Sequence, residues 1–180
     1  IPFPAGAAAD TVGRTFASKF AEIWGQQVIA DNRGGANTIV GSEIAAKAAP
    51  DGYTLFLTSA TTQVTNPLLY RKLPYDARKS FQPIALTAEV PFAVVTHPSL
   101  PVISVKELVA YAKARPGELA YASSGSGSVG HIAGALFETM TGTKMVHVPY
   151  KGGGPATIDL VGGQILLYFA TMPTIAVHLQ

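Results

Sequence analysis

The spacing of hydrophobic residues predicts helices alternating with strands along the chain. Between Asp10 and Trp24 they recur every three or four positions, which is typical of a helix with one buried face. Ser104 with Glu107 three residues later is a capping box, which marks the start of another helix. The same criteria predict further helices at 39–48, 61–70, 128–141 and 155–161, and strands at 27–30, 53–58, 84–86, 92–96, 119–122, 145–148 and 165–169.

Strands that alternate with helices of this length favour an α/β fold with a mainly parallel sheet covered by helices on both faces. Strands buried on both faces read as continuous hydrophobic runs. This agrees with a composition of 48% hydrophobic and only 13% charged residues.

Composition excludes several classes of function. The low charge content and a net charge of +2 argue against disorder and against a nucleic-acid partner. The chain has no cysteine, and His97, His147 and His178 show no metal-ligand spacing, so neither a metal nor a cofactor is expected. Residues 160–177 carry no charge, but glycine, glutamine and proline interrupt them, so we expect a helix end, a strand and a loop rather than a membrane span.

The small-residue loop at 122–131 is the most informative segment. It follows a predicted strand and opens a helix, where backbone N–H groups and the helix terminus favour a carboxylate or phosphate. The alternative is a plain Ser/Gly connector capped by Ser128. The glycine spacing also matches a dinucleotide fingerprint, but no acidic residue follows at 147–151, where that fingerprint requires one. A Ser128–His131 hydrolase site lacks an acid to orient the histidine.

Four other loops follow predicted strand ends, at 3–9, 59–62, 150–155 and 170–173. Ligands of open α/β sheets bind outside the carboxyl ends of the strands, so these loops are candidates to line one cleft. Asp10 is expected to cap the first helix. Lys151 either faces an anion or is simply solvated.

A series of short motifs occurs in a fixed order along the whole chain. They are Pro-Phe-Pro-Ala-Gly at 2–6, Asp-Asn-Arg-Gly-Gly-Ala-Asn at 31–37, Ala-Ala-Pro-Asp-Gly-Tyr-Thr-Leu at 48–55, Asn-Pro-Leu-Leu-Tyr at 66–70, Leu-Pro-Tyr-Asp at 73–76 and His-Val-Pro-Tyr-Lys-Gly at 147–152. This series resembles the solute receptors of tripartite tricarboxylate transporters, also called Bug-type receptors.

The resemblance implies a periplasmic binding protein of the type II kind, with two α/β lobes around a cleft. Such a receptor captures a small carboxylate and delivers it to a membrane permease, without catalysis. We expect a first lobe at 1–96, a second at 97–180, and a crossover at 97–101. Because family members are longer, both lobes are expected to be partial and the chain truncated at both ends, without its signal peptide.

The resemblance also implies a set of ligand-binding residues. The first loop would contact the ligand and the 123–131 loop would give donors to a carboxylate, while the others would tune selectivity. The set is Phe3, Pro4, Ala5, Gly6, Ala7, Thr61, Thr62, Ser123, Ser124, Gly125, Ser126, Gly127, Ser128, His131, Lys151, Gly152 and Thr171. Thr171 stands where the family often has Asp or Asn, which favours a plain carboxylate over an amino acid.

Two other interpretations stay open at this point. One is an enzyme that acts on a small carboxylate through His131 or Lys151. The other is a truncated form that does not bind ligand and pairs with a second copy by strand exchange, because a missing edge strand exposes unpaired backbone.

Overall fold

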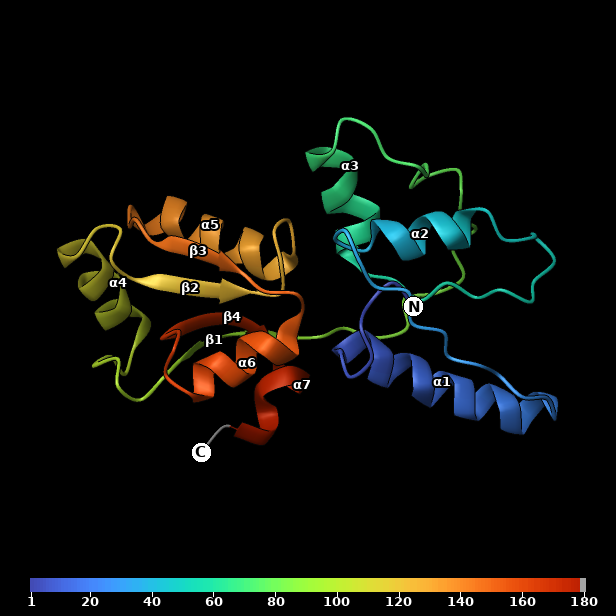
Figure 1. The fold of residues 1–180 in the computed structure, drawn as a ribbon, viewed down its shortest axis with the longest axis horizontal. Helices are drawn as coiled ribbons and strands as arrows, with labels where there is room; N and C mark the ends of the chain where they lie inside the picture. The colour runs from blue at the N-terminus through green and yellow to red at the C-terminus, as the bar shows by residue number, and fades with distance from the viewer. Residues whose placement is uncertain (179–180) are drawn as a thin grey trace. The chain divides into compact units, whose positions relative to one another are not determined.

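The computed structural model describes residues 1–178 and divides into two compact units, Ile1–Glu89 and Val90–Gln180 (Figure 1). The division falls before the strand at 92–96, whereas the sequence analysis put it after that strand. The strand belongs to the second unit because it pairs along its whole length with a strand from near the end of the chain. The predicted crossover also lies in the second unit, where Leu100 is part of the buried core.

The first unit is built on helices. They are α1 (Ala8–Trp24), α2 (Ile39–Ala46), a π-helical turn η1 (Thr61–Thr65) and α3 (Asn66–Leu69). Helix α1 ends where Gly25 adopts a left-handed conformation, with φ of 63°, and donates its N–H to the carbonyl of Ala21. The predicted helices at 10–24, 39–48 and 61–70 are therefore confirmed in position.

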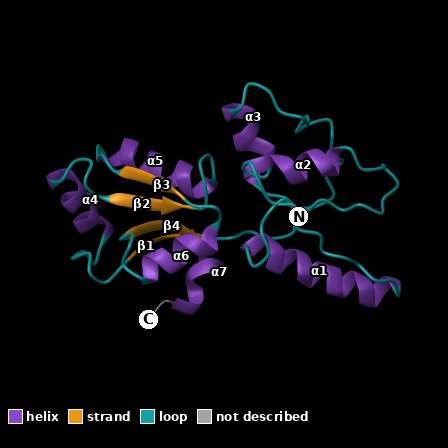
Figure 2. Ribbon diagram, viewed as in Figure 1, coloured by secondary structure: helices purple, strands orange, loops and turns teal. Residues whose placement is uncertain are grey.

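The strands predicted in the first unit, at 27–30, 53–58 and 84–86, are wrong. These segments are extended, but pairing among residues 1–178 is confined to one sheet in the second unit (Figure 2). A strand exists only when its N–H and C=O groups form a ladder with a neighbour. Hydrophobic side chains on these segments accordingly stay exposed, including Ile29, Tyr53, Leu55, Ile84 and Leu86.

The second unit has a four-stranded sheet in the order β1-β4-β2-β3. Its strands are β1 (Phe92–Thr96), β2 (Ala120–Ser123), β3 (Val146–Pro149) and β4 (Leu167–Thr171). The pairs β2–β3 and β2–β4 are parallel, whereas β1 runs antiparallel to β4 at the edge. The α/β class with a mainly parallel sheet is confirmed, since two of the three strand pairs are parallel. The sheet is mixed because an antiparallel edge strand can join a parallel sheet without a crossover helix.

Helices cover both faces of this sheet (Figure 1). They are α4 (Val105–Ala114), α5 (Val129–Thr141), α6 (Gly153–Val161), α7 (Met172–Ile175) and the short 3₁₀ turn η2 (Ala176–His178). Successive strand residues point to opposite faces. Tyr121 therefore packs in the core that α4 and α5 cover, while its neighbour Ala122 packs in the core that α6 and α7 cover.

Serine caps fix two helix starts in the second unit. The hydroxyl of Ser104 accepts from the Glu107 N–H at 3.2 Å, and the Glu107 carboxylate accepts from the Ile103 N–H at 2.8 Å. The hydroxyl of Ser128 accepts from the His131 N–H at 3.3 Å. The capping box and the Ser128 cap are confirmed.

Residues 160–177 form the end of α6, then β4, α7 and most of η2. Across residues 1–178 the structure holds no helix long and hydrophobic enough to span a membrane.

Candidate functional site

Three candidate segments of the second unit lie at the carboxyl ends of the mutually parallel strands β2, β3 and β4, and so at one edge of the sheet. The predicted loop at 170–173 is instead the end of β4 and the start of α7. The first two are neighbours, since the Tyr150 N–H donates to the Ser123 carbonyl at 3.0 Å. Lys151 and Ser126 are exposed at this edge, whereas Thr171 is half-buried. This edge is where α/β folds place ligands.

Several donors of the loop at 123–131 are already bonded within it. The Gly125 N–H donates to the Ser123 hydroxyl at 3.1 Å, and the Gly127 N–H donates to Nδ1 of His131 at 3.0 Å. The Ser128 N–H donates to the Gly125 carbonyl.

The loop also keeps donors that no other described residue accepts. Among residues 1–178, these are the N–H groups of Ser124, Ser126, Val129 and Gly130. Ser124 and Ser126 belong to the loop itself, whereas Val129 and Gly130 form the first turn of α5. Unbonded N–H groups there, with the positive end of the helix dipole, suit an anion.

Close packing fixes α5 against the sheet. A Cβ on Gly130 would lie 2.5 Å from the backbone oxygen of Phe169 in β4, and a Cβ on Gly134 would overlap the ring of Tyr121 in β2. Both glycines therefore let the helix approach the strands, which places the helix start at the edge where β4 ends.

Two histidines support the loop from behind. The rings of His131 on α5 and His147 on β3 stack with centroids 3.9 Å apart and planes inclined by 14°. Nε2 of His147 lies 2.7 Å from the Ser123 hydroxyl, which also lies 3.0 Å from the Gly125 carbonyl oxygen. Burial, and secondly the neighbouring His131, lower the pKa of His147 to about 4, so this ring is neutral at neutral pH.

The Ser123–His147 pair resembles two members of a catalytic triad, but its surroundings indicate a structural role. Ser123 is fully buried, so its oxygen cannot reach a substrate. No carboxylate within residues 1–178 hydrogen-bonds to His147, whereas a triad orients its histidine through an acid. The pair therefore ties β2 to β3 under the loop.

In the first unit a buried carboxylate anchors the loop at residues 3–7. Asp10 accepts from the Gly6 N–H at 2.8 Å, from Nδ2 of Asn32 at 2.9 Å and from Nε of Arg14 at 3.0 Å. Asn32 in turn donates to the Phe3 carbonyl at 3.1 Å. The expectation that Asp10 caps α1 as its N-cap residue is wrong: the N-cap is Ala7, and Asp10 reaches back from the third helical position.

This network holds Asp10 ionised. Burial by itself would raise the pKa of its carboxyl, but the hydrogen bonds from Arg14, Gly6 and Asn32 outweigh burial and leave the pKa below its ordinary value. Because Gly6 gives its N–H to Asp10 and Ala7 gives its own to the Pro4 carbonyl, neither donates to a ligand in this conformation.

The predicted threonines of the first unit are buried. The Thr62 hydroxyl lies 2.7 Å from that of Thr38, and the Thr62 carbonyl accepts from the Tyr75 hydroxyl at 2.9 Å. Thr61 is also buried. Both residues lie in the π-helical turn, and a ligand would reach Thr62 only after this network opened.

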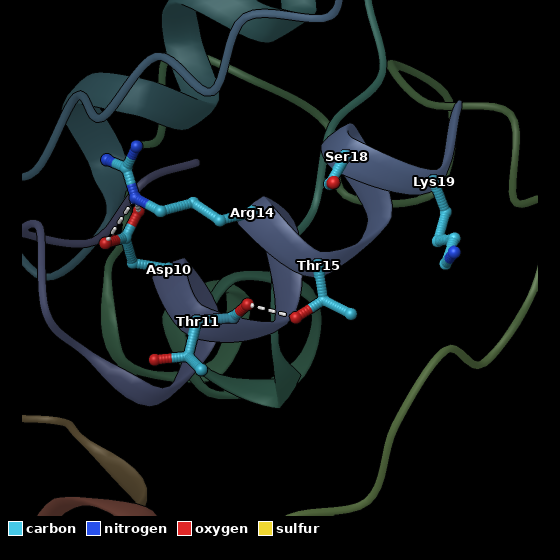
Figure 3. A pocket seen from close by; sticks show the side chains of 6 residues that line it. All are labelled: Asp10, Thr11, Arg14, Thr15, Ser18 and Lys19. Carbon is cyan, nitrogen blue, oxygen red and sulfur yellow. Dashed lines mark hydrogen bonds and ion pairs between the residues drawn. The ribbon is translucent and has the colours of Figure 1, made fainter. Parts of the chain in front are cut away.

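An open hollow runs along one polar face of α1 (Figure 3). Its charged groups are already paired, since Arg14 folds back onto Asp10 and Lys19 lies 2.7 Å from Glu22. The hollow contains none of the predicted ligand residues. It is lined by Asp10, Thr11, Arg14, Thr15, Ser18 and Lys19.

Sequence reasoning missed two positions around these loops. His147 lies in the motif at 147–152 without an assigned role, because its contacts with Ser123 and His131 join residues distant in sequence. Asn32 lay in a recognised motif without an assigned role, and the structure places it between Asp10 and Phe3.

Comparisons with known proteins agree on one family. Residues 12–180 match the model of the tripartite tricarboxylate transporter family receptor. Protein BugT of Bordetella pertussis is 38% identical over 100% of this chain, which covers 56% of that protein.

Solved structures give the same result. R. palustris Rpa4515 with adipate is similar with a TM-score of 0.93 and 38% identity, over 97% of this chain and 58% of that one. MatC from Rhodopseudomonas palustris with bound malate is similar with a TM-score of 0.88 and 30% identity, over 99% of this chain and 61% of that one.

The chain thus spans somewhat more than half the length of the proteins that it resembles. Identity of 38% over the whole chain, a family match from residue 12 to the end, and a shared fold lead to one conclusion. This chain belongs to the tripartite tricarboxylate transporter receptor family.

Proposed function

We propose that this protein binds a small carboxylate reversibly, and that the loop at 123–131 receives the carboxylate group. The observation that carries the proposal is the set of four unbonded N–H groups, those of Ser124, Ser126, Val129 and Gly130, before and at the start of α5. A hydrogen bond to a charged group contributes about 1.5–3 kcal/mol. Three or four of them, less the cost of ordering the ligand, correspond to an affinity of about micromolar.

The family relation supports the ligand class. The related structures named above hold adipate and malate, both dicarboxylates. In the proposal, Lys151 and Gly152 after β3 and Thr171 at the end of β4 adjust selectivity. Residues 3–7 of the first unit provide further contacts, and Thr61 and Thr62 take part only if their buried network opens.

The proposal extends to the role of the whole protein. Family membership favours a periplasmic receptor that hands its ligand to a membrane permease. Binding without chemistry is favoured over an enzyme, because Nδ1 of His131 is occupied by a backbone N–H and Ser123 is buried. No nucleic-acid partner and no cofactor belong to the proposed function. Whether the chain pairs with a second copy is a separate question for size-exclusion chromatography.

Calorimetric titration with adipate and with malate tests the proposal. Ser126→Asp puts a negative charge on the loop. A substitution at the neighbouring Gly127 would strain the backbone, because its φ of 78° disfavours any residue with a side chain. We expect at least about tenfold weaker binding, or about 1.4 kcal/mol. Ser18→Asp adds the same charge to α1 and is the matched control. Equal affinity in wild type and Ser126→Asp would remove this loop from the site.

A further inference from the structure

We propose that His131 is a positioning residue for the carboxylate loop: its neutral ring holds the Gly127 N–H and thereby fixes the neighbouring N–H groups toward the ligand. This inference rests on the proposed function, because it concerns the same loop. It goes beyond that function by assigning His131 an indirect role in place of direct ligand contact.

The hydrogen-bond geometry defines the protonation state. Nδ1 of His131 accepts the Gly127 N–H at 3.0 Å, so Nδ1 carries no proton and the neutral ring has its proton on Nε2. A protonated ring would place an N–H opposite the N–H of Gly127 at that distance. Two donors cannot share one hydrogen bond, so the loop in this form requires the neutral ring.

The same contact decides which donors remain for a ligand. With φ of 78°, Gly127 is in the left-handed region, and its N–H turns back toward α5. The hydrogen bond from Gly127 to His131 anchors the loop. On either side of it, the N–H groups of Ser126 and Val129 form no hydrogen bond with any residue among 1–178. Loss of the anchor frees a glycine-rich loop to take other conformations, and the donors lose their common direction.

The ring of His131 lies against a second imidazole. A second imidazole, His147 on β3, stacks on the ring at 3.9 Å, so two charged rings would repel each other. Tyr121 on β2 packs against His147 with ring centroids 5.1 Å apart. Burial, and secondly Glu138 on α5, raise the pKa of Tyr121 to about 12, which keeps it uncharged. Phe169 of β4, which is also uncharged, packs on Tyr121.

The inference predicts a specific pH dependence. Imidazole is the side chain that changes charge between about pH 5 and 8. Because the pKa of His147 is lowered to about 4, His147 stays neutral down to about pH 5.5. A loss of the Gly127 contact above about pH 5.5 therefore reports on protonation of the His131 ring and not of the His147 ring.

The first experiment needs no ligand. Long-range ¹H–¹⁵N correlation spectra of the chain at about pH 7.5 should show His131 with its proton on Nε2, and the Gly127 amide should be protected from hydrogen exchange. Protection of the Gly127 amide should fall as the His131 ring becomes protonated, which the ¹⁵N shifts of that ring report in the same spectra. A proton on Nδ1 at the higher pH, or an unprotected Gly127 amide, overturns the inference.

Two variants separate positioning from packing. His131→Phe keeps an aromatic ring on His147 but has no acceptor, and should lose Gly127 protection and weaken adipate and malate binding at least about tenfold. His131→Asn keeps an acceptor near Nδ1 but cannot titrate. It should bind within about threefold of wild type at about pH 7.5 and lose the extra pH dependence. His178→Asn, at an exposed position on η2, is the matched control.

Comparison with His131→Asn also cancels any titration of the ligand itself, since that occurs equally in both proteins. If His131→Phe keeps Gly127 protection and affinity, the inference is wrong. If Gly127 behaves as expected but wild type binds neither adipate nor malate, the positioning contact stands and the proposed function fails for these ligands.

Discussion

Gly130→Ala provides a sharp test of how α5 meets the sheet. Helix propensity alone predicts that alanine stabilises a helix relative to glycine by about 0.5–1 kcal/mol. The structure predicts the opposite, because the new Cβ would lie 2.5 Å from the backbone oxygen of Phe169. Carbon–oxygen contacts settle at about 3.3 Å or more, so α5 or β4 must move by about 0.8 Å.

The expected loss follows from these opposing effects. Overpacking of a closely packed site costs about 1–3 kcal/mol, and the gain in propensity offsets part of it. We therefore expect Gly130→Ala to lower the free energy of unfolding by about 1.5 kcal/mol. The contact is with backbone, which cannot turn aside as a side chain can, so the movement should also displace the start of α5.

Gly154→Ala is the matched control. Gly154 is also the second residue of its helix, α6, and does not have a positive φ. Among residues 1–178, a Cβ at this position would meet nothing within 4 Å beyond its own helical turn. Alanine there should change stability by less than about 1 kcal/mol, because the gain in helix propensity opposes the restriction that Pro155 places on a preceding residue with a Cβ. Urea unfolding of both variants, followed by circular dichroism and extrapolated linearly to water, measures the difference. If Gly130→Ala is as stable as Gly154→Ala, the close approach of α5 to β4 is refuted.

Three further measurements test other contacts. Ser128→Ala removes the N-cap acceptor of α5 and should cost about 1 kcal/mol in urea unfolding, whereas Ser124→Ala at an exposed position should stay within about 0.5 kcal/mol of wild type. Asp10→Asn breaks the charged contacts of the buried carboxylate with Arg14 and should cost about 1–3 kcal/mol at neutral pH. The pKa of Asp10 is lower in the folded chain than in the unfolded chain, where it is about 4. The contribution of Asp10 to the free energy of unfolding is therefore present above about pH 4 and is lost as the pH falls through the folded pKa. Equal acid unfolding profiles for Asp10→Asn and wild type would contradict this. The pKa of His147 is lowered from 6.5 to about 4, so the unfolded chain binds more protons between these values and stability should fall as pH drops through that window. A pH titration of unfolding should show this slope in wild type and lose it in His147→Gln.

Local sequence determined two helix starts and one helix end. Ser104 and Ser128 cap helices through N–H groups only three residues away, and Gly25 ends α1 through the carbonyl of Ala21. The small-residue segment before α5 likewise identified the candidate loop. These features depend on neighbours within one helical turn, so they can be predicted from the chain alone.

Tertiary structure decided which extended segments became strands. Phe92–Thr96 pairs with β4, far along the chain, and so joined the second unit, whereas 53–58, also rich in hydrophobic residues, has no paired neighbour among residues 1–178. A ladder of hydrogen bonds needs two segments, and the sequence of one segment does not specify its partner. The antiparallel edge of the sheet and the division at Glu89 follow from that pairing.

The candidate site shows the same distinction. The sequence placed Gly127 and His131 in the loop as separate ligand contacts, and only the folded chain shows that one donates to the other. His147 comes beneath the loop because β3 pairs with β2, which brings it within hydrogen-bond distance of Ser123. Sequence thus identifies a loop of candidate donors, but packing between distant segments determines which of their N–H groups remain free, because each N–H group can serve only one strong acceptor.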